Sequence, residues 1–303
     1  MDSLLFWLAL ISSGFMAWAV GANDVANAMG TSVGSKIITI KQAIFIAAVF
    51  EGLGALLASG TVTGTLRNDV IDVQYYDEKI MILARGMIAS LSASATWLII
   101  ATRKGWPVST THSIVGALVG FGLVTQGIYK IRWINIGYIA AGWVLTPIVS
   151  AFAAWVCFRV VQRVVLTREN PVGYAVKFVS ATIAILVLLG IESSLRYVDI
   201  PHFHGVGILL SGLVYLLSYY VLNLHSSNAL AYRDQCQDAE LLFGRLALLS
   251  ACALAYAHGA NDVANAIGPM VSVVDIFTYG YLPQESSIPL WVLFWGAGGV
   301  VLG

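Results

Sequence analysis

An eight-residue segment with three polar side chains occurs twice in a strongly apolar background. Residues 21–28 and residues 259–266 both read GANDVANA, about 238 positions apart. On a helix, the first Asn, the Asp and the second Asn of each copy share one face, since residues three and four apart are neighbours. An ionisable side chain at membrane depth costs at least about 2.5 kcal/mol on insertion scales. Two identical copies therefore indicate a binding face, whereas one copy alone would also fit close helix packing by small residues.

The first candidate ligands are the polar residues of the two GANDVANA copies. They are Asn23, Asp24 and Asn27 in the first copy and Asn261, Asp262 and Asn265 in the second. Glycines bracket each copy, so we expect the helix to unwind at either end and expose backbone groups. Unwound backbone at membrane depth is tolerated only where it lines a cavity or binds an ion.

A second group of polar residues lies between the copies, where residues 105–112 read GWPVSTTH. Gly105 is expected to end one helix, and Pro107 suits the first position of the next because its missing N–H is not needed there. Ser109, Thr110 and Thr111 then place hydroxyls beside the unpaired amides of a helix N-terminus, a typical oxyanion site. A simple Ser/Thr cap remains the alternative. Two basic residues just before the run place it near the membrane surface unless the helix is broken or re-entrant.

The composition predicts the elements that must position these residues. The chain has 303 residues, of which 58% are hydrophobic and 11% charged; soluble domains carry about 25% charged residues. Apolar segments of about 20 residues indicate an all-α polytopic membrane protein. A formal net charge of zero argues against a nucleic-acid partner. About nine segments are expected, at residues 3–29, 43–64, 80–101, 108–127, 134–158, 174–191, 206–222, 243–270 and 288–303.

The loops between these segments predict an orientation. Alternate loops carry ten against six basic residues, a bias that places the N-terminus outside. The two GANDVANA copies would then run antiparallel, as in inverted-repeat transporters whose site lies where the repeats meet. We expect residues 1–222 to hold the N-terminal repeat and following helices, residues 223–242 to form a polar linker, and residues 243–303 to start the second repeat.

The doubled GANDVANA and the intervening PVSTTH run resemble the inorganic phosphate transporter (PiT) family of sodium- or proton-coupled symporters. Residues 50–55, FEGLGA, and the residues AHG that lead into the second copy also match. The resemblance covers nearly the whole chain. It implies an inverted-repeat fold with broken or re-entrant helices in a cell membrane, either plasma or bacterial inner. It also implies that phosphate and cations bind between the repeats.

The resemblance and the residue chemistry together give a set of predicted ligands. Phosphate is assigned to Asn23, Asp24, Ser109, Thr110, Thr111, Asn261 and Asp262. The coupling cation is assigned to Asp24, Asn27, Glu51, Asp262 and Asn265, with Na⁺ held at the four of these that lie in the GANDVANA copies. Neither motif contains Lys or Arg, so phosphate beside two Asp residues needs Na⁺ or protons to neutralise the repulsion. We expect the cation to bind before phosphate, and no cofactor beyond it.

One feature departs from the family pattern. Family members have a second PVSTTH-like run in the C-terminal half, which would begin near position 346 here, beyond Gly303. We therefore expect a chain that lacks about three C-terminal helices. Comparing residues 50–55 with the second half also pairs Glu51 with Trp295, so this carboxylate is not duplicated.

Parts of the sequence also fit functions other than phosphate symport. A membrane-embedded enzyme could use His112 or His258, but no HExxH-like spacing is present, and no enzymatic activity is expected. His202 and His204 form a short pair that could hold a metal or be solvated. A symporter of another tetrahedral oxyanion such as sulfate, and an inactive fragment, stay as alternatives. The lipid bilayer is an expected partner, and self-association into a homo-oligomer is left open.

Overall fold

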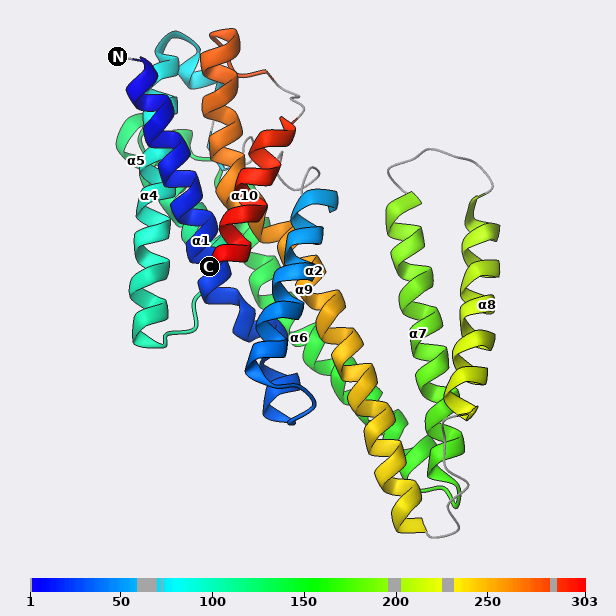
Figure 1. Cartoon of the computed structure of the whole chain (residues 1–303). Coiled ribbons are helices and arrows are strands. Elements are labelled where there is room, and N and C mark those ends of the chain that lie inside the picture. The colour runs from blue at the N-terminus through cyan, green and yellow to red at the C-terminus, as the bar shows by residue number, and fades with distance from the viewer. Residues whose placement is uncertain (1, 59–69, 72, 196–202, 225–231, 284–287) are drawn as a thin grey trace. The chain divides into compact units, whose positions relative to one another are not determined.

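In the computed structural model of this protein, every regular element is helical. It describes residues 2–58, 70–71, 73–195, 203–224, 232–283 and 288–303. The α-helices within these ranges are α1 (Asp2–Gly34), α2 (Ile40–Ala58), α4 (Ile80–Lys104), α5 (Thr110–Gln126), α6 (Trp133–Val161), α7 (Pro171–Leu195), α8 (Phe203–Leu224), α9 (Tyr232–Tyr279) and α10 (Leu290–Leu302). Each of the nine predicted apolar segments forms most of one of these helices, which confirms the all-α membrane fold (Figure 1). Seven of them are long and apolar enough to cross a membrane.

The helices form two compact units, each described by itself. The first contains Met1–Trp143 and Ser250–Gly303, and the second contains Val144–Leu249. In the second unit, α7 packs against α8, and a small apolar core that includes Val165, Val176 and Leu242 joins them to the adjoining helix ends. Of the predicted linker 223–242, residues 225–231 lie outside the described residues and the part from Tyr232 onward is helical in α9.

The first unit contains the inverted repeat. Within it α1 and the last part of α9 run in opposite directions, as do α2 and α10 (Figure 1). The first glycine of each GANDVANA copy lies at a helix crossing: a Cβ at Gly21 would overlap the carbonyl oxygen of Val300, and one at Gly259 would overlap that of Glu51. The crossing of α1 with α10 is thus repeated by the crossing of α9 with α2.

A second pair of contacts shows the same correspondence between α1 and α9 and between α2 and α10. A Cβ at Gly54 of α2 would overlap the carbonyl oxygen of Tyr256 in α9, and one at Gly303 would overlap that of Trp18 in α1. Trp18 and Tyr256 lie three residues before the first glycine of their own GANDVANA copy. Exchanging α1 with α9, and α2 with α10, therefore maps each contact onto the other.

This exchange corrects the predicted counterpart of Glu51. The paired contacts make Val300, five positions after Trp295, the structural equivalent of Glu51. The same register makes Gly52 equivalent to Val301, and a Cβ built at Gly52 would lie 3.2 Å from Val301 Cγ2. Sequence comparison matched residues 50–55 to the wrong turn of the second helix, because both helices are apolar and rich in glycine.

The glycines of the GANDVANA copies do not unwind their helices, contrary to our expectation. The α1 helix is continuous through Gly21 and Gly30, and α9 is continuous through Gly259. The physical reason is close packing: at Gly21 and Gly259 a main-chain carbonyl of the crossing helix occupies the space of a side chain. The polar groups of the copies are therefore presented as side chains on intact helices.

The break in helical structure lies instead between α4 and α5. Gly105 ends α4, as predicted, and it does so in a left-handed conformation with φ +66°. Ser109 is the N-cap of α5, so Pro107 precedes the helix rather than opening it. After α4 the chain turns back along the bundle before α5 begins (Figure 1). With 17 residues, α5 rises about 26 Å, less than the hydrocarbon thickness of about 30 Å.

Candidate functional site

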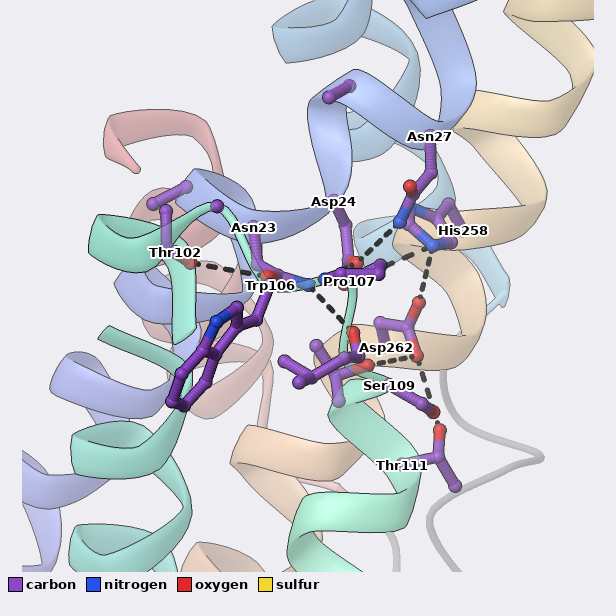
Figure 2. A pocket seen from close by; sticks show the side chains of 15 residues that line it. Asn23, Asp24, Asn27, Thr102, Trp106, Pro107, Ser109, Thr111, His258 and Asp262 are labelled. Carbon is purple, nitrogen blue, oxygen red and sulfur yellow. Dashed lines mark hydrogen bonds and ion pairs between the residues drawn. The ribbon is translucent and has the colours of Figure 1, made fainter. Parts of the chain in front are cut away.

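Both GANDVANA-bearing helices and the turn before α5 line one cavity of about 610 Å³ in the first unit. Side chains from α1, the end of α4, the turn and α9 converge on it (Figure 2). Because α5 starts at Thr110, its N-terminus opens toward this cavity. The predicted oxyanion donors and the predicted acidic face therefore meet in one place.

The first GANDVANA copy forms a closed hydrogen-bond group on α1. The side-chain amides of Asn23 and Asn27 donate to Oδ1 of Asp24 at 2.9 and 3.1 Å. Asn23 Nδ2 also donates to the carbonyl oxygen of Val108 at 3.1 Å, and Thr102 Oγ1 donates to Asn23 Oδ1 at 3.2 Å. These bonds confirm that the three polar residues share a face, and they tie α1 to the turn and to α4 (Figure 2).

The second copy makes different contacts, because its Asp faces the start of α5. Thr110 Oγ1 and Thr111 Oγ1 donate to Oδ1 of Asp262 at 3.1 and 3.4 Å. Asn265 Nδ2 donates to the same oxygen at 3.0 Å and to Thr111 Oγ1 at 3.1 Å. The Asp262 carboxylate thus accepts hydrogen bonds from the hydroxyl groups that we predicted to bind an oxyanion.

His258 joins the two copies. Its Nε2 lies 2.9 Å from Asp262 Oδ2 and 4.0 Å from Asp24 Oδ2, and its Nδ1 lies 3.8 Å from Glu51 Oε1. Glu51 is buried behind the imidazole and does not line the cavity. The predicted ligand set omitted His258. The available signal was its position four residues before Asp262, which places both on one helix face.

Seven of the ten predicted ligands line the cavity, and Glu51, Asn261 and Asn265 do not. Ser109 lines it, and its hydroxyl accepts a hydrogen bond from the His112 amide at 3.3 Å. Asn265 is buried directly behind Asp262. Asn261 is exposed and does not line the cavity, whereas Asp262 and Asn265 are buried. The prediction that all three share one face is therefore wrong for Asn261, because adjacent residues on a helix point about 100° apart. The geometry does not support assigning Asn261 to phosphate. His202 and the side chain of His204 lie outside the described residues.

The charges around the cavity are strongly unequal. Asp24 and Asp262 line it, whereas no Lys or Arg is among the described residues that do. His258 is the one described lining side chain that can carry a positive charge. The N-terminus of α5 adds the partial positive charge of its free amides. The arrangement can hold an anion at the hydroxyl run and a cation at the carboxylates.

Comparisons with known proteins agree on one family. The profile described as "Phosphate transporter family" matches residues 20–303. A putative phosphate permease of Haemophilus influenzae is 38% identical over 310 residues, covering 99% of this chain and 74% of the relative. The "Inorganic phosphate transporter 2-1, chloroplastic" of Arabidopsis thaliana is 36% identical over 332 residues and is covered over 56% of its length. A solved structure titled "The sodium-dependent phosphate transporter" superposes with a TM-score of 0.90 at 32% identity, over 99% of this chain and 74% of that one.

Proposed function

Because this chain belongs to the phosphate transporter family, we propose that it carries inorganic phosphate across a cell membrane in symport with a cation, Na⁺ or H⁺. One observation carries the proposal: a helix N-terminus with hydroxyl donors and two buried carboxylates share a cavity between inverted repeats. Sites of this kind are typical of inverted-repeat transporters. The structural relative is titled sodium-dependent, which supports Na⁺ as the coupling ion.

Phosphate is assigned to the start of α5. Residues 109–111 all line the cavity, and the amides of Thr110 and Thr111 precede the first intrahelical bond, from Ser113 N to Ser109 O. Such amides and the helix dipole favour a bound anion. Asn23 contributes by fixing the turn through its bond to Val108 O.

The cation is assigned to the carboxylates. Asp24 and Asp262 are 3% and 8% exposed, and buried carboxylates strongly favour a neutralising partner. Asn27 and Asn265 hold Oδ1 of their own Asp, which leaves each Oδ2 directed toward the space between the copies.

Coupling follows from Asp262. Its Oδ1 accepts bonds from Thr110 and Thr111, so Asp262 competes with phosphate for these donors. A cation bound at Asp262 removes the repulsion between this carboxylate and phosphate and weakens its hold on the hydroxyls. The cation therefore binds first, and phosphate affinity rises when it is present.

Orientation and assembly are further parts of the proposal. The excess of basic residues in alternate loops favours an N-terminus on the outside of a plasma or bacterial inner membrane. A homo-oligomer remains an untested prediction.

The test is uptake of labelled phosphate into proteoliposomes under an imposed Na⁺ or H⁺ gradient. We expect uptake to require one of the gradients, and Thr110→Val with Thr111→Val to reduce it at least about tenfold, since donors to a charged group are each worth about 1.5–3 kcal/mol. Thr125→Val is the matched control on the same helix, because Thr125 contacts Tyr76 and not the cavity. Uptake of sulfate in preference to phosphate, or equal uptake with no gradient, would contradict the proposal.

A further inference from the structure

Three metal-ligating side chains meet inside the cavity. Asp24, His258 and Asp262 each offer one ligand atom, and these atoms lie within 4.8 Å of one another. We propose that they form a binding site for one divalent transition-metal ion of the Zn²⁺ and Co²⁺ class. The site goes beyond the proposed coupling cation because a nitrogen ligand takes part.

The distances fit such an ion with little movement. Bonds from a metal of this class to imidazole nitrogen or carboxylate oxygen are about 2.0–2.2 Å, so neighbouring ligand atoms lie about 3–4 Å apart. His258 Nε2 is 2.9 Å from Asp262 Oδ2 and 4.0 Å from Asp24 Oδ2. The three atoms come from both inverted repeats, so an ion here would bridge α1 and α9.

An independent observation points to a missing partner. Asp24 is 3% exposed, and its Oδ2 is buried without a hydrogen-bond partner, whereas its Oδ1 accepts bonds from two side-chain amides. A buried acceptor without a partner is destabilising, and more so when the group is charged. An ion between Asp24 and His258 would satisfy it.

The donor set selects the class of ion. Imidazole nitrogen suits Zn²⁺ and neighbouring transition metals, whereas Ca²⁺ and Mg²⁺ prefer oxygen ligands throughout. The Nδ1 side of His258 faces Glu51, whose Oε1 is buried and has no hydrogen-bond partner. A carboxylate behind a metal-bound imidazole orients the ring and strengthens the ligand. Three protein ligands leave an open position on the side of the cavity.

The inverted repeat predicts one such site per chain. The residue equivalent to Glu51 is Val300, and the residue equivalent to His258, which precedes the first glycine of its GANDVANA copy, is Val20. The imidazole of His258 on α9 and the carboxylate of Glu51 on α2 therefore have no counterparts on α1 and α10. Because the site uses both Asp residues, the divalent ion and the coupling cation should compete.

The test uses Co²⁺ with the purified full chain in nanodiscs, with no phosphate and no Na⁺ present. We expect one Co²⁺ per chain with visible absorption bands of nitrogen and oxygen coordination, displaced by Zn²⁺ and weakened by added Na⁺. His258→Ala should lower Co²⁺ affinity at least about 100-fold. A variant with His112, His202, His204 and His225 all changed to Ala should keep it, because His258 is then the one remaining histidine.

Folding and the proposed function are separated in the same experiment. Helicity and thermal unfolding are recorded for each variant, and Glu51→Gln, which keeps the shape of the side chain, should weaken Co²⁺ by about 10–100-fold. Equal affinity in the wild type and a folded His258→Ala variant, or no visible bands at millimolar Co²⁺, overturns the metal site. Neither result depends on phosphate uptake, so failure of the transport proposal would be seen separately.

Discussion

The two GANDVANA copies have the same eight residues but different surroundings. In the first copy, Asp24 Oδ1 is held by the amides of Asn23 and Asn27 from its own helix. In the second, Asp262 Oδ1 also accepts hydrogen bonds from the two Thr hydroxyls at the start of α5, and its Oδ2 contacts His258. Identical sequences therefore supply unequal halves of one site. The difference comes from the turn before α5 and from the imidazole of His258, neither of which is repeated within the described residues.

Mutations can test what the two copies share and where they differ, and the largest effect is expected at the helix crossings, which both copies share. Gly259→Val should prevent folding, because the added side chain would overlap the Glu51 carbonyl, and overpacking against a main-chain atom exceeds the usual cost of about 1–3 kcal/mol. Gly30→Val is the matched control, since no atom lies within 4 Å of a Cβ built there. The yield of monodisperse protein after detergent extraction measures the difference. Equal yields would show that the crossing is not tightly packed.

The two Asp residues should differ in their effect on transport. Asp262→Asn should reduce phosphate uptake by about 100-fold, because it removes the buried carboxylate that holds the coupling cation next to the phosphate donors. Asp24→Asn should reduce uptake by about tenfold and mainly raise the cation concentration needed for half-maximal rate. Initial rates in proteoliposomes over a range of cation concentrations separate the two. Indistinguishable profiles would mean that the copies act as equals.

The smallest effect is expected for the hydrogen bond from Thr102 that holds the Asn23 side chain in place. Thr102→Val removes the hydroxyl that fixes the Asn23 side chain and should raise the KM for phosphate about threefold, since a neutral hydrogen bond contributes about 0.5–1.5 kcal/mol. Thr96→Val is the control on the same helix, because Thr96 is exposed and bonds only to Ser92 O of its own helix among the bonds described. A larger effect in Thr96→Val than in Thr102→Val would argue against a positioning role.

The sequence predicted the features that depend on helical periodicity. The Asp and the second Asn of each copy are three residues apart, so that spacing places them together, and a hydrogen bond in each copy confirms it. Hydropathy likewise located all nine described helices. The end of α4 at Gly105 was predicted as well, and the left-handed conformation found there is one that glycine adopts without strain.

The features that were missed depend on which helices touch. A glycine within a membrane helix permits unwinding and close approach equally well, and only the carbonyls opposite Gly21 and Gly259 decide between them. Asn23 and Asn261 occupy the same position in identical motifs, yet only Asn23 meets the turn before α5. The role of His258 likewise depends on Glu51 and Asp24, which lie on other helices.

The central claim is that a cation at the carboxylates permits phosphate to bind at the start of α5. Phosphate affinity of the purified chain, measured by isothermal titration calorimetry across Na⁺ concentration and pH, tests it most directly. The account predicts that Na⁺ or a lower pH strengthens phosphate binding at least about tenfold, or about 1.4 kcal/mol, and that Asp262→Asn removes this dependence. Phosphate affinity that changes with neither Na⁺ nor pH would contradict it.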